Sequence, residues 1–422
     1  MLSSIFHKFI KDIKSIPFGV KLIVFVIFLR SFGWGFADPF YSLYLHKFHV
    51  DYTVVGLFTA VLSVSALLSM IPLMRLTDKM KETTIISNGE LLYFFVIIAY
   101  VIAGVFKSIP LLIITLIFAG VAQTFVVVGS EAYIRKHNNR GKTNPFAYYV
   151  AIDYLGWIIG MFIAAYGIKF YDLNTMFLFV IPSIIASFFI LPRVHERGIK
   201  SFLRGIKRYF HSRKDVMSIY EDCKGVTPKL IFFLILAFFD GVVRMFSFIF
   251  IPLFGVSINL SLKTIALLMA VIYFPFILSF FFSEVSARFK RMNVIATSLF
   301  VGALSFILLY FVVDRFWIVI FAAMISLSMA IVRPIYNGAI TLLTPRRMLG
   351  EITGFNNLIE RLGRIVGPIF TGIIADIYGL PATFLMIAVI AFGLGATSLI
   401  LRGYDYLTYP TKLIKSKFKI GN

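Results

Sequence analysis

The sequence predicts an all-α membrane protein with twelve transmembrane helices in two pseudo-symmetric six-helix bundles. Of its 422 residues, 59% are hydrophobic and only 14% are charged, and the mean hydropathy is +0.91. A soluble domain is about 45–50% apolar and about 25% charged, so this composition indicates a chain that crosses a bilayer several times. A repeated segment indicates the two halves, and the distribution of basic residues indicates the orientation.

The repeated segment occurs twice, about 207 positions apart. Residues 152–160 read Ile-Asp-Tyr-Leu-Gly-Trp-Ile-Ile-Gly, and residues 359–367 read Ile-Glu-Arg-Leu-Gly-Arg-Ile-Val-Gly. In each copy an acidic residue in an apolar helix precedes two glycines spaced four apart. Internal repeats with charged residues near the middle of the bilayer are typical of secondary transporters.

Twelve apolar runs are long enough to span a bilayer, which takes about 20 residues of helix. We expect the spans at 17–45, 53–74, 83–105, 109–134, 144–168 and 173–191, then at 228–254, 263–283, 293–312, 316–340, 350–376 and 381–401. The chain therefore divides into an N-terminal bundle (1–191), a basic linker (192–227) and a C-terminal bundle with a basic tail (228–422). Apolar and basic residues recur at helical spacing in the linker, which predicts an amphipathic helix on the inner leaflet.

Basic residues give the chain a formal net charge of +21, and they are distributed unevenly. If the spans alternate in direction, 31 Lys and Arg fall on the side of the termini and linker, five fall on the other side and five lie within spans. This asymmetry follows the positive-inside rule and predicts a multi-pass protein of the cell membrane with both termini in the cytoplasm. The basicity therefore indicates topology rather than a nucleic-acid partner.

The sequence lacks the motifs of several other classes of protein. The single cysteine, Cys223, excludes an internal disulfide, no His/Cys/Asp cluster has metal-ligand spacing, and no Gly-rich phosphate-binding loop is present. We therefore expect no cofactor, no metal and no enzymatic activity. The expected partners of this chain, taken as a monomer, are the lipid bilayer, a small-molecule substrate and protons.

Six plus six spans, a basic linker, and charged turns after spans two and eight resemble the major facilitator superfamily over nearly the whole chain. Residues 362–372, Leu-Gly-Arg-Ile-Val-Gly-Pro-Ile-Phe-Thr-Gly, are similar to the family pattern Gly-x-x-x-Gly-Pro-x-x-x-Gly. The turn at 75–81 is similar to the family's Gly-x-x-x-Asp-Arg-x-Gly-Arg-Arg turn, with Met74 in place of the first glycine. Residues 109–130 lack the arginine that many proton-driven exporters carry early in the fourth helix. The resemblance implies two bundles that rock about a central site.

Nine charged residues lie deep in the predicted spans, where an ionised side chain costs about 2.5–3.5 kcal/mol and usually faces water or a partner. They are Arg30, Asp38, Asp153, Asp240, Arg244, Arg333, Glu360, Arg361 and Arg364. Glu131 lies nearer the cytoplasmic end of span four, and Glu90 on span three is placed close to the cytoplasmic face and outside the site. The resemblance implies that spans one, four, seven and ten line the pathway and that spans two, five, eight and eleven flank it. All nine deep residues fall on these spans, which predicts a polar central cavity.

These residues divide into proton-coupling and substrate-binding candidates. We expect protons to be carried by acids, with Asp153 first because no basic residue lies within one turn of it in its helix. The full set of acids is Asp153, Asp38, Glu131, Asp240 and Glu360. Guanidinium groups offer forked donors to carboxylate or phosphate, so the predicted substrate-binding residues are Arg30, Trp34, Arg244, Arg333, Asn337, Arg361 and Arg364.

Structural roles are the alternatives for the same residues. Asp240 with Arg244, and Glu360 with Arg364, are spaced i, i+4 and can form ion pairs along one helix. Arg30 and Asp240 can pair as a latch between the bundles. Asp38 precedes Pro39 and can serve local geometry at a kink.

Glycines and charged turns form a third group of candidates. Small residues four apart allow close packing of membrane helices, and the same positions can act as hinges when the bundles rock; these are Gly156, Gly160, Gly363, Gly367 and Pro368. Charged latches at the cytoplasmic face are predicted at Asp78, Lys79 and Arg288, for which solvation of the loops is the alternative.

Together these features predict a secondary active transporter that moves a small solute by alternating access, with proton coupling and a polar or anionic substrate. Efflux of amphipathic compounds, as in multidrug export, is the alternative in the same class. A non-transporting membrane receptor or lipid-binding scaffold is the alternative of another class.

Overall fold

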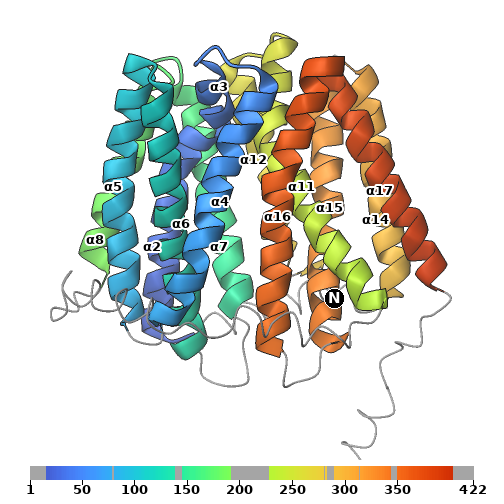
Figure 1. The fold of residues 1–422 in the computed structure, drawn as a ribbon, viewed down its shortest axis with the longest axis horizontal. Coiled ribbons are helices and arrows are strands. Elements are labelled where there is room, and N and C mark those ends of the chain that lie inside the picture. Colours follow the sequence, from blue (N-terminus) through green and yellow to red (C-terminus); the bar gives the residue numbers. More distant parts are fainter. Residues whose placement is uncertain are drawn as a thin grey trace, which may run out of the picture.

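The computed structural model describes residues 16–77, 80–137, 145–191, 228–279, 281–282, 289–312, 314–343 and 349–402. In this part of the chain the helices stand side by side along one direction (Figure 1). Nine of the helices found there are long and apolar enough to cross a membrane. Two further apolar segments are shorter, at Thr175–Ile190 and Leu262–Ile277, and the thirty-residue helix α16 completes the twelve predicted spans. The all-α, twelve-span architecture is thus confirmed.

The N-terminal bundle follows the predicted spans closely. Its elements are α2 (Phe18–Ala37), η1 (Asp38–Phe40), α3 (Tyr41–His46), α4 (Tyr52–Thr77), α5 (Glu82–Phe106), α6 (Ile109–His137), α7 (Pro145–Gly167), η2 (Thr175–Phe179) and α8 (Val180–Ile190). The first span is interrupted by the 3-10 turn η1 because Pro39 has no N–H with which to continue the α-helical ladder. The 3-10 turn begins at Asp38, so Asp38 lies at a break in the helix, as its alternative structural role predicts.

The C-terminal bundle has the same order of long helices. Its elements are α11 (Pro228–Ser257), α12 (Leu262–Ile277), α14 (Arg291–Phe311), α15 (Arg315–Leu343), α16 (Leu349–Tyr378) and α17 (Leu380–Arg402). Prolines occur inside four of these helices, namely Pro252, Pro275, Pro334 and Pro368.

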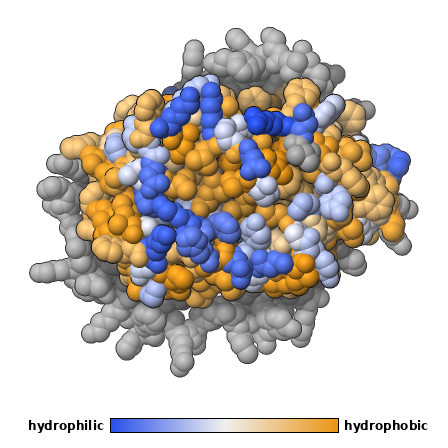
Figure 2. All heavy atoms as spheres, turned by 90° about the horizontal axis from the view of Figure 1, so that it is seen from above, coloured by the Kyte–Doolittle hydropathy of each residue, from blue (hydrophilic) through white to orange (hydrophobic). Residues whose placement is uncertain are grey.

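The helices end at two opposite faces of the molecule, the linker face and the far face. The linker face is the end at which α8 stops at Ile190 and α11 starts at Pro228; the far face is the end at which α3 stops at His46 and α4 starts at Tyr52. Figure 2 looks onto the far face, where hydrophilic side chains gather in bands among apolar ones. The linker, the C-terminal tail, Asp78, Lys79 and Arg288 lie outside the described residues.

The repeated segment packs in the same way in both bundles. A side chain at Gly160 of α7 would meet the carbonyl of Phe32 on α2, and one at Gly363 of α16 would meet the carbonyl of Phe238 on α11. In each bundle the helix that carries the repeat therefore lies with its backbone directly against the first helix of that bundle. Gly156 and Gly367 line the same two contacts. These glycines lie in close contacts between helices, and the hinge function stays a prediction.

The two bundles meet along two seams, α4 against α16 and α7 against α12. In the first seam a Cβ at Gly56 of α4 would meet the carbonyl of Pro368. Helices α4 and α16 therefore also touch backbone to backbone. Pro368, unlike the glycines before it, takes part in the contact between bundles.

Candidate functional site

Three arginines converge on two carboxylates inside the C-terminal bundle. Arg244 Nη2 lies 2.9 Å from Asp240 Oδ2, and Arg244 Nη1 lies 3.4 Å from Glu360 Oε1. Arg333 reaches the same two acids, at 3.7 Å from Asp240 and 3.6 Å from Glu360. Arg364 also pairs with Glu360. The network joins α11, α15 and α16 and carries one net positive charge.

Neutral polar side chains extend this network. The Tyr336 hydroxyl donates a hydrogen bond of 3.0 Å to Asp240 Oδ2. The side-chain amide of Asn356 donates to Asn337 Oδ1 at 2.9 Å, and the Asn337 amide donates to the carbonyl of Arg333 at 3.1 Å. Tyr336 and Asn356 are buried. Tyr336 therefore fixes the orientation of Asp240, and Asn356 fixes that of Asn337. Asn356 is an addition to the predicted site.

Two of these arginines have an N–H donor that no described residue accepts. The Nε atoms of Arg244 and Arg364 are buried, and within the described residues neither has a hydrogen-bond acceptor. A buried donor without a partner costs about 1–3 kcal/mol. An anionic group that entered the network would therefore gain hydrogen bonds that the protein itself does not supply.

A second cluster lies inside the N-terminal bundle around Arg30. This arginine on α2 is 7% exposed, and the charges near it are Asp153 on α7 and Glu90 on α5, with the phenols of Tyr93 and Tyr149. Its Nε atom has no acceptor in the part of the chain described here.

Asp153 finds its partners inside its own bundle. Ser31 on α2 donates a hydrogen bond to Asp153 Oδ1. Arg30 is the cation that interacts electrostatically with Asp153. The described partners of Asp153 are therefore groups of its own bundle.

Asp38 lies between the two clusters. It is 4% exposed, and its Oδ2 atom has no hydrogen-bond donor among the described residues. It interacts electrostatically with Arg30 in its own bundle and with Tyr273 of α12 in the other. Tyr273 in turn interacts with Arg244 and Arg364, so aromatic side chains connect the acids of one half to the arginines of the other.

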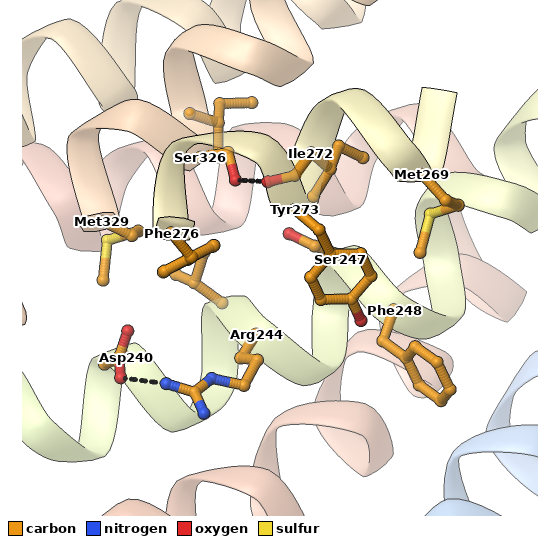
Figure 3. A pocket seen from close by; sticks show the side chains of 12 residues that line it. Asp240, Arg244, Ser247, Phe248, Met269, Ile272, Tyr273, Phe276, Ser326 and Met329 are labelled. Atoms are coloured by element: carbon orange, nitrogen blue, oxygen red, sulfur yellow. Dashed lines mark hydrogen bonds and ion pairs between the residues drawn. The ribbon is translucent and has the colours of Figure 1, made fainter. Parts of the chain in front are cut away.

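Aromatic rings fill the seam between α7 and α12 at this depth. Tyr154 stacks on Phe276 with ring centroids 5.1 Å apart, and Trp157 lies 5.7 Å from Tyr273. Beside them is a small cavity of about 20 Å³ that Asp240, Arg244 and Tyr273 help to line (Figure 3). That volume holds about one water molecule, so a larger solute requires the bundles to move apart.

The far face is closed by contacts between the bundles. Tyr41 on α3 stacks on Phe248 on α11 with ring centroids 5.7 Å apart, and Lys263 Nζ lies 4.3 Å from the ring centroid of Tyr166. Asp376 at the end of α16 accepts hydrogen bonds from the first turn of α4. Access to the central charges from this side therefore requires these contacts to break.

The remaining predicted residues have different surroundings. Arg361 makes no ion pair within the described part of the chain and lies in electrostatic range of Glu131 on α6, in the opposite bundle. Trp34 packs edge-on against Tyr93 at 5.4 Å, and its indole N–H has no acceptor among the described residues. Arg30 and Asp240 are not paired: Asp240 is taken by Arg244 and Arg333. The structure therefore does not form the Arg30–Asp240 latch.

Glu90 is the residue that sequence reasoning misplaces. The expected position is close to the cytoplasmic face, yet Glu90 is fully buried and lies eight residues into α5, beside Arg30. The signal is present in the sequence, because an acid two turns inside an apolar span needs a partner or a proton.

Comparisons with known proteins agree with this geometry. The family model described as Major Facilitator Superfamily matches residues 23–271 and 230–419. No curated protein matches the sequence. Among solved structures, the chain is similar to the nucleoside transporter NupG, with 15% identity and a TM-score of 0.65 over 92% of this chain and 100% of that chain. It is also similar to a POT family transporter in complex with 5-aminolevulinic acid, with 14% identity and a TM-score of 0.69 over 93% and 99%. At these identities the likeness shows the fold.

Proposed function

Since the chain belongs to the Major Facilitator Superfamily and is a secondary transporter rather than an enzyme, we propose that it moves a small anionic solute by alternating access, coupled to protons. The observation that supports this most is the arginine network of the C-terminal bundle. Three guanidinium groups from three helices surround two carboxylates, and two of them retain buried N–H donors without acceptors among the described residues.

The arginines suit an anion because of geometry as well as charge. A guanidinium presents several N–H donors in one plane and matches a carboxylate or a phosphate with two parallel hydrogen bonds. Asp240 interacts with two arginines, and Glu360 interacts with three. We assign these two acids to holding the arginines in place, since each of them pairs with arginines from more than one helix.

The proton carriers in this proposal belong to the N-terminal bundle. One arginine, Arg30, faces Asp153 and Asp38, and Glu131 lies opposite Arg361. Acids in excess over cations in a buried site take up protons more readily than acids surrounded by arginines. We therefore retain Asp153 as the first candidate, with Asp38 and Glu131 beside it.

Efflux of amphipathic compounds is a second candidate function. Apart from Asp240, Arg244 and two serines, the cavity at α11, α12 and α15 is lined by apolar and aromatic side chains, among them Phe248, Met269 and Phe276. An amphipathic compound would place its apolar part against these side chains. Its charged or polar group would then lie at Asp240 and Arg244.

We also propose that the linker face is cytoplasmic and that the membrane is the cell membrane. The support is the excess of 31 basic residues over five between the two sides, because positively charged loops are retained in the cytoplasm.

Ligand-dependent stabilisation of the purified full-length chain tests the choice of solute. A ligand that binds only the folded protein raises its melting temperature. The panel contains small carboxylates, phosphate esters, their neutral amide or alcohol analogues, and cationic amphiphiles. We expect at least one carboxylate or phosphate ester to raise the melting temperature, its neutral analogue to have no effect, and Arg333→Gln and Arg364→Gln to lose the response.

Arg402→Gln is the matched control, since Arg402 is exposed at the end of α17 and the variant should respond like the wild type. Stabilisation by cationic amphiphiles alone would favour the efflux function. Anion responses that survive unchanged in both Arg333→Gln and Arg364→Gln would contradict the proposed binding site.

A further inference from the structure

Glu90 is a buried acid whose two oxygens have no hydrogen-bond donor among the described residues. It is 0% exposed, and neither Oε1 nor Oε2 has a partner there. The residue before it, Gly89, packs against Phe125 and Val126 of α6 with less room than a Cβ atom needs. Helix α5 is therefore held tightly against α6 at the residue before Glu90.

The charged groups that face Glu90 can be named helix by helix. Arg30 on α2 is the cation that interacts with it, and Tyr93 on α5 is the nearest phenol. The ionisable side chains of α6 all follow Ser130. Of these, Lys136 pairs with Glu82 in the first turn of α5 at 2.9 Å, and Glu131 interacts with Tyr149 and Arg361. The segments η2 and α8, which also pack on α5, contain no ionisable side chain.

Glu90 and Asp153 lie at the same depth on two sides of Arg30. Each is eight residues from the start of its helix, α5 or α7, which is about 12 Å from the linker face at 1.5 Å per residue. Arg30 is twelve residues into α2, and helical side chains point back toward the N-terminus of the helix. Its guanidinium therefore extends toward the level of both acids, and it interacts with both.

Glu90 and Asp153 thus form a trio with Arg30, the cation that both interact with. Asp38 of η1 also interacts with Arg30 and is a third acid beside this trio. With both acids ionised, the trio would carry a buried net negative charge, and with one proton bound it is neutral. A buried charge is tolerated only when it is paired. A single proton therefore neutralises the trio of Glu90, Asp153 and Arg30, and Arg30 pairs with whichever of these two acids lacks that proton.

We propose that Glu90 is a second proton site of the transport cycle and that it exchanges one proton with Asp153 as Arg30 moves between the two carboxylates. The inference rests on the proposed proton coupling and adds a residue to it. In the exchange an O–H bond breaks at one carboxyl and forms at the other, so the trio stays neutral. When Glu90 holds the proton, Arg30 pairs with Asp153; when Asp153 holds it, Arg30 pairs with Glu90.

Infrared difference spectroscopy tests this without a substrate. The full-length chain in proteoliposomes is titrated over pH, and the carbonyl stretch of protonated carboxylic acids is followed in H₂O and D₂O. We expect Glu90→Gln to lose the intensity that the shared proton contributes to the buried-acid band of the wild type, because Asp153 then pairs with Arg30 and needs no proton. The intensity that remains belongs to other buried acids, such as Asp38. Glu90→Asp should keep the band at a shifted frequency, because it retains a carboxyl at the site.

Glu82→Gln is the control, because Glu82 already pairs with the exposed Lys136, and its spectrum should match the wild type. A Glu90→Gln spectrum identical to the wild type would overturn the inference about Glu90. Proton movement driven by the solute panel decides the proposed function separately. If no panel solute moves protons through the wild type, the proposed proton coupling is wrong, whatever the spectra show. If the wild type moves protons but Glu90→Gln shows no spectral change, only the inference about Glu90 is wrong.

Discussion

The carboxylate of Asp376 in the C-terminal bundle accepts a 2.8 Å hydrogen bond from the backbone N–H of Thr53 in the N-terminal bundle. The same carboxylate accepts from the N–H of Tyr52 at 2.9 Å and from the Thr53 hydroxyl at 2.5 Å. Asp376, which lies in the C-terminal bundle, thus acts as the N-cap of α4 in the N-terminal bundle. In the proposed alternating access, opening the far face separates the two residues, so this cap would stabilise only the closed far face.

Removing the cap should favour opening at the far face. Loss of an N-cap costs about 1 kcal/mol, so we expect Asp376→Ala to raise the population open at the far face about fivefold. The measurement is the rate at which a membrane-impermeant maleimide applied at the far face labels Ser247→Cys, a cavity-lining position, in a Cys223→Ser background.

Asp314→Ala is the matched control for this experiment. Asp314 also accepts a backbone hydrogen bond in the first turn of a helix, 2.9 Å from the Phe316 nitrogen, but both residues belong to the C-terminal bundle. Labelling in Asp314→Ala should stay at the wild-type rate. Equal acceleration in both variants would mean that helix capping in general, and not the contact between bundles, controls access.

Gly363→Ala should destabilise the fold because its new methyl group would meet the Phe238 carbonyl on α11. Overpacking of this kind costs about 1–3 kcal/mol. At Gly393 a Cβ atom would have nothing within 4 Å, so Gly393→Ala should be neutral or slightly stabilising, because alanine is the better helix former. Melting temperatures of the two purified variants test this, and equal values would contradict the assigned packing role.

Glu360→Gln should be more destabilising than an equivalent change at an ion pair whose cation is exposed to solvent. The substitution leaves Arg244, Arg333 and Arg364 without the charge they share, and breaking a buried pair costs about 3–5 kcal/mol. Glu82→Gln removes a pair with Lys136, whose side chain is 64% exposed, and should cost at most about 1 kcal/mol. Denaturation of both variants in detergent gives the comparison; a similar loss in each would show that the network is not a buried unit.

The sequence is a good guide to the helices because a membrane span needs only a long apolar run. The sequence is a poorer guide to features that depend on contacts between helices. Pro39 divides the first span into α2, η1 and α3. The depth of Glu90 can be read from its span, but its position beside Arg30 cannot, because it depends on how α2 packs on its neighbours. The i, i+4 pairs Asp240–Arg244 and Glu360–Arg364 could be predicted from spacing. The contacts of Arg333 with both acids could not, since they join separate helices.

The native cysteine allows a test of orientation. Cys223 is the only cysteine in the sequence and belongs to the basic linker. We expect a membrane-impermeant maleimide to leave it unlabelled in intact cells and to label it after permeabilisation. A Cys223→Ser/Lys169→Cys variant should show the opposite, because Lys169 lies at the far face, just after α7 ends. Labelling of Cys223 in intact cells would reverse the proposed topology.

The division of labour between the bundles is tested most directly by measuring solute counterflow and proton movement together in proteoliposomes of Asp153→Asn and Arg333→Gln. The solute is the panel member that stabilises the wild type most. The account predicts that Asp153→Asn retains counterflow and loses solute-driven proton movement, whereas Arg333→Gln loses both. Normal proton movement in Asp153→Asn, or normal counterflow in Arg333→Gln, would contradict it.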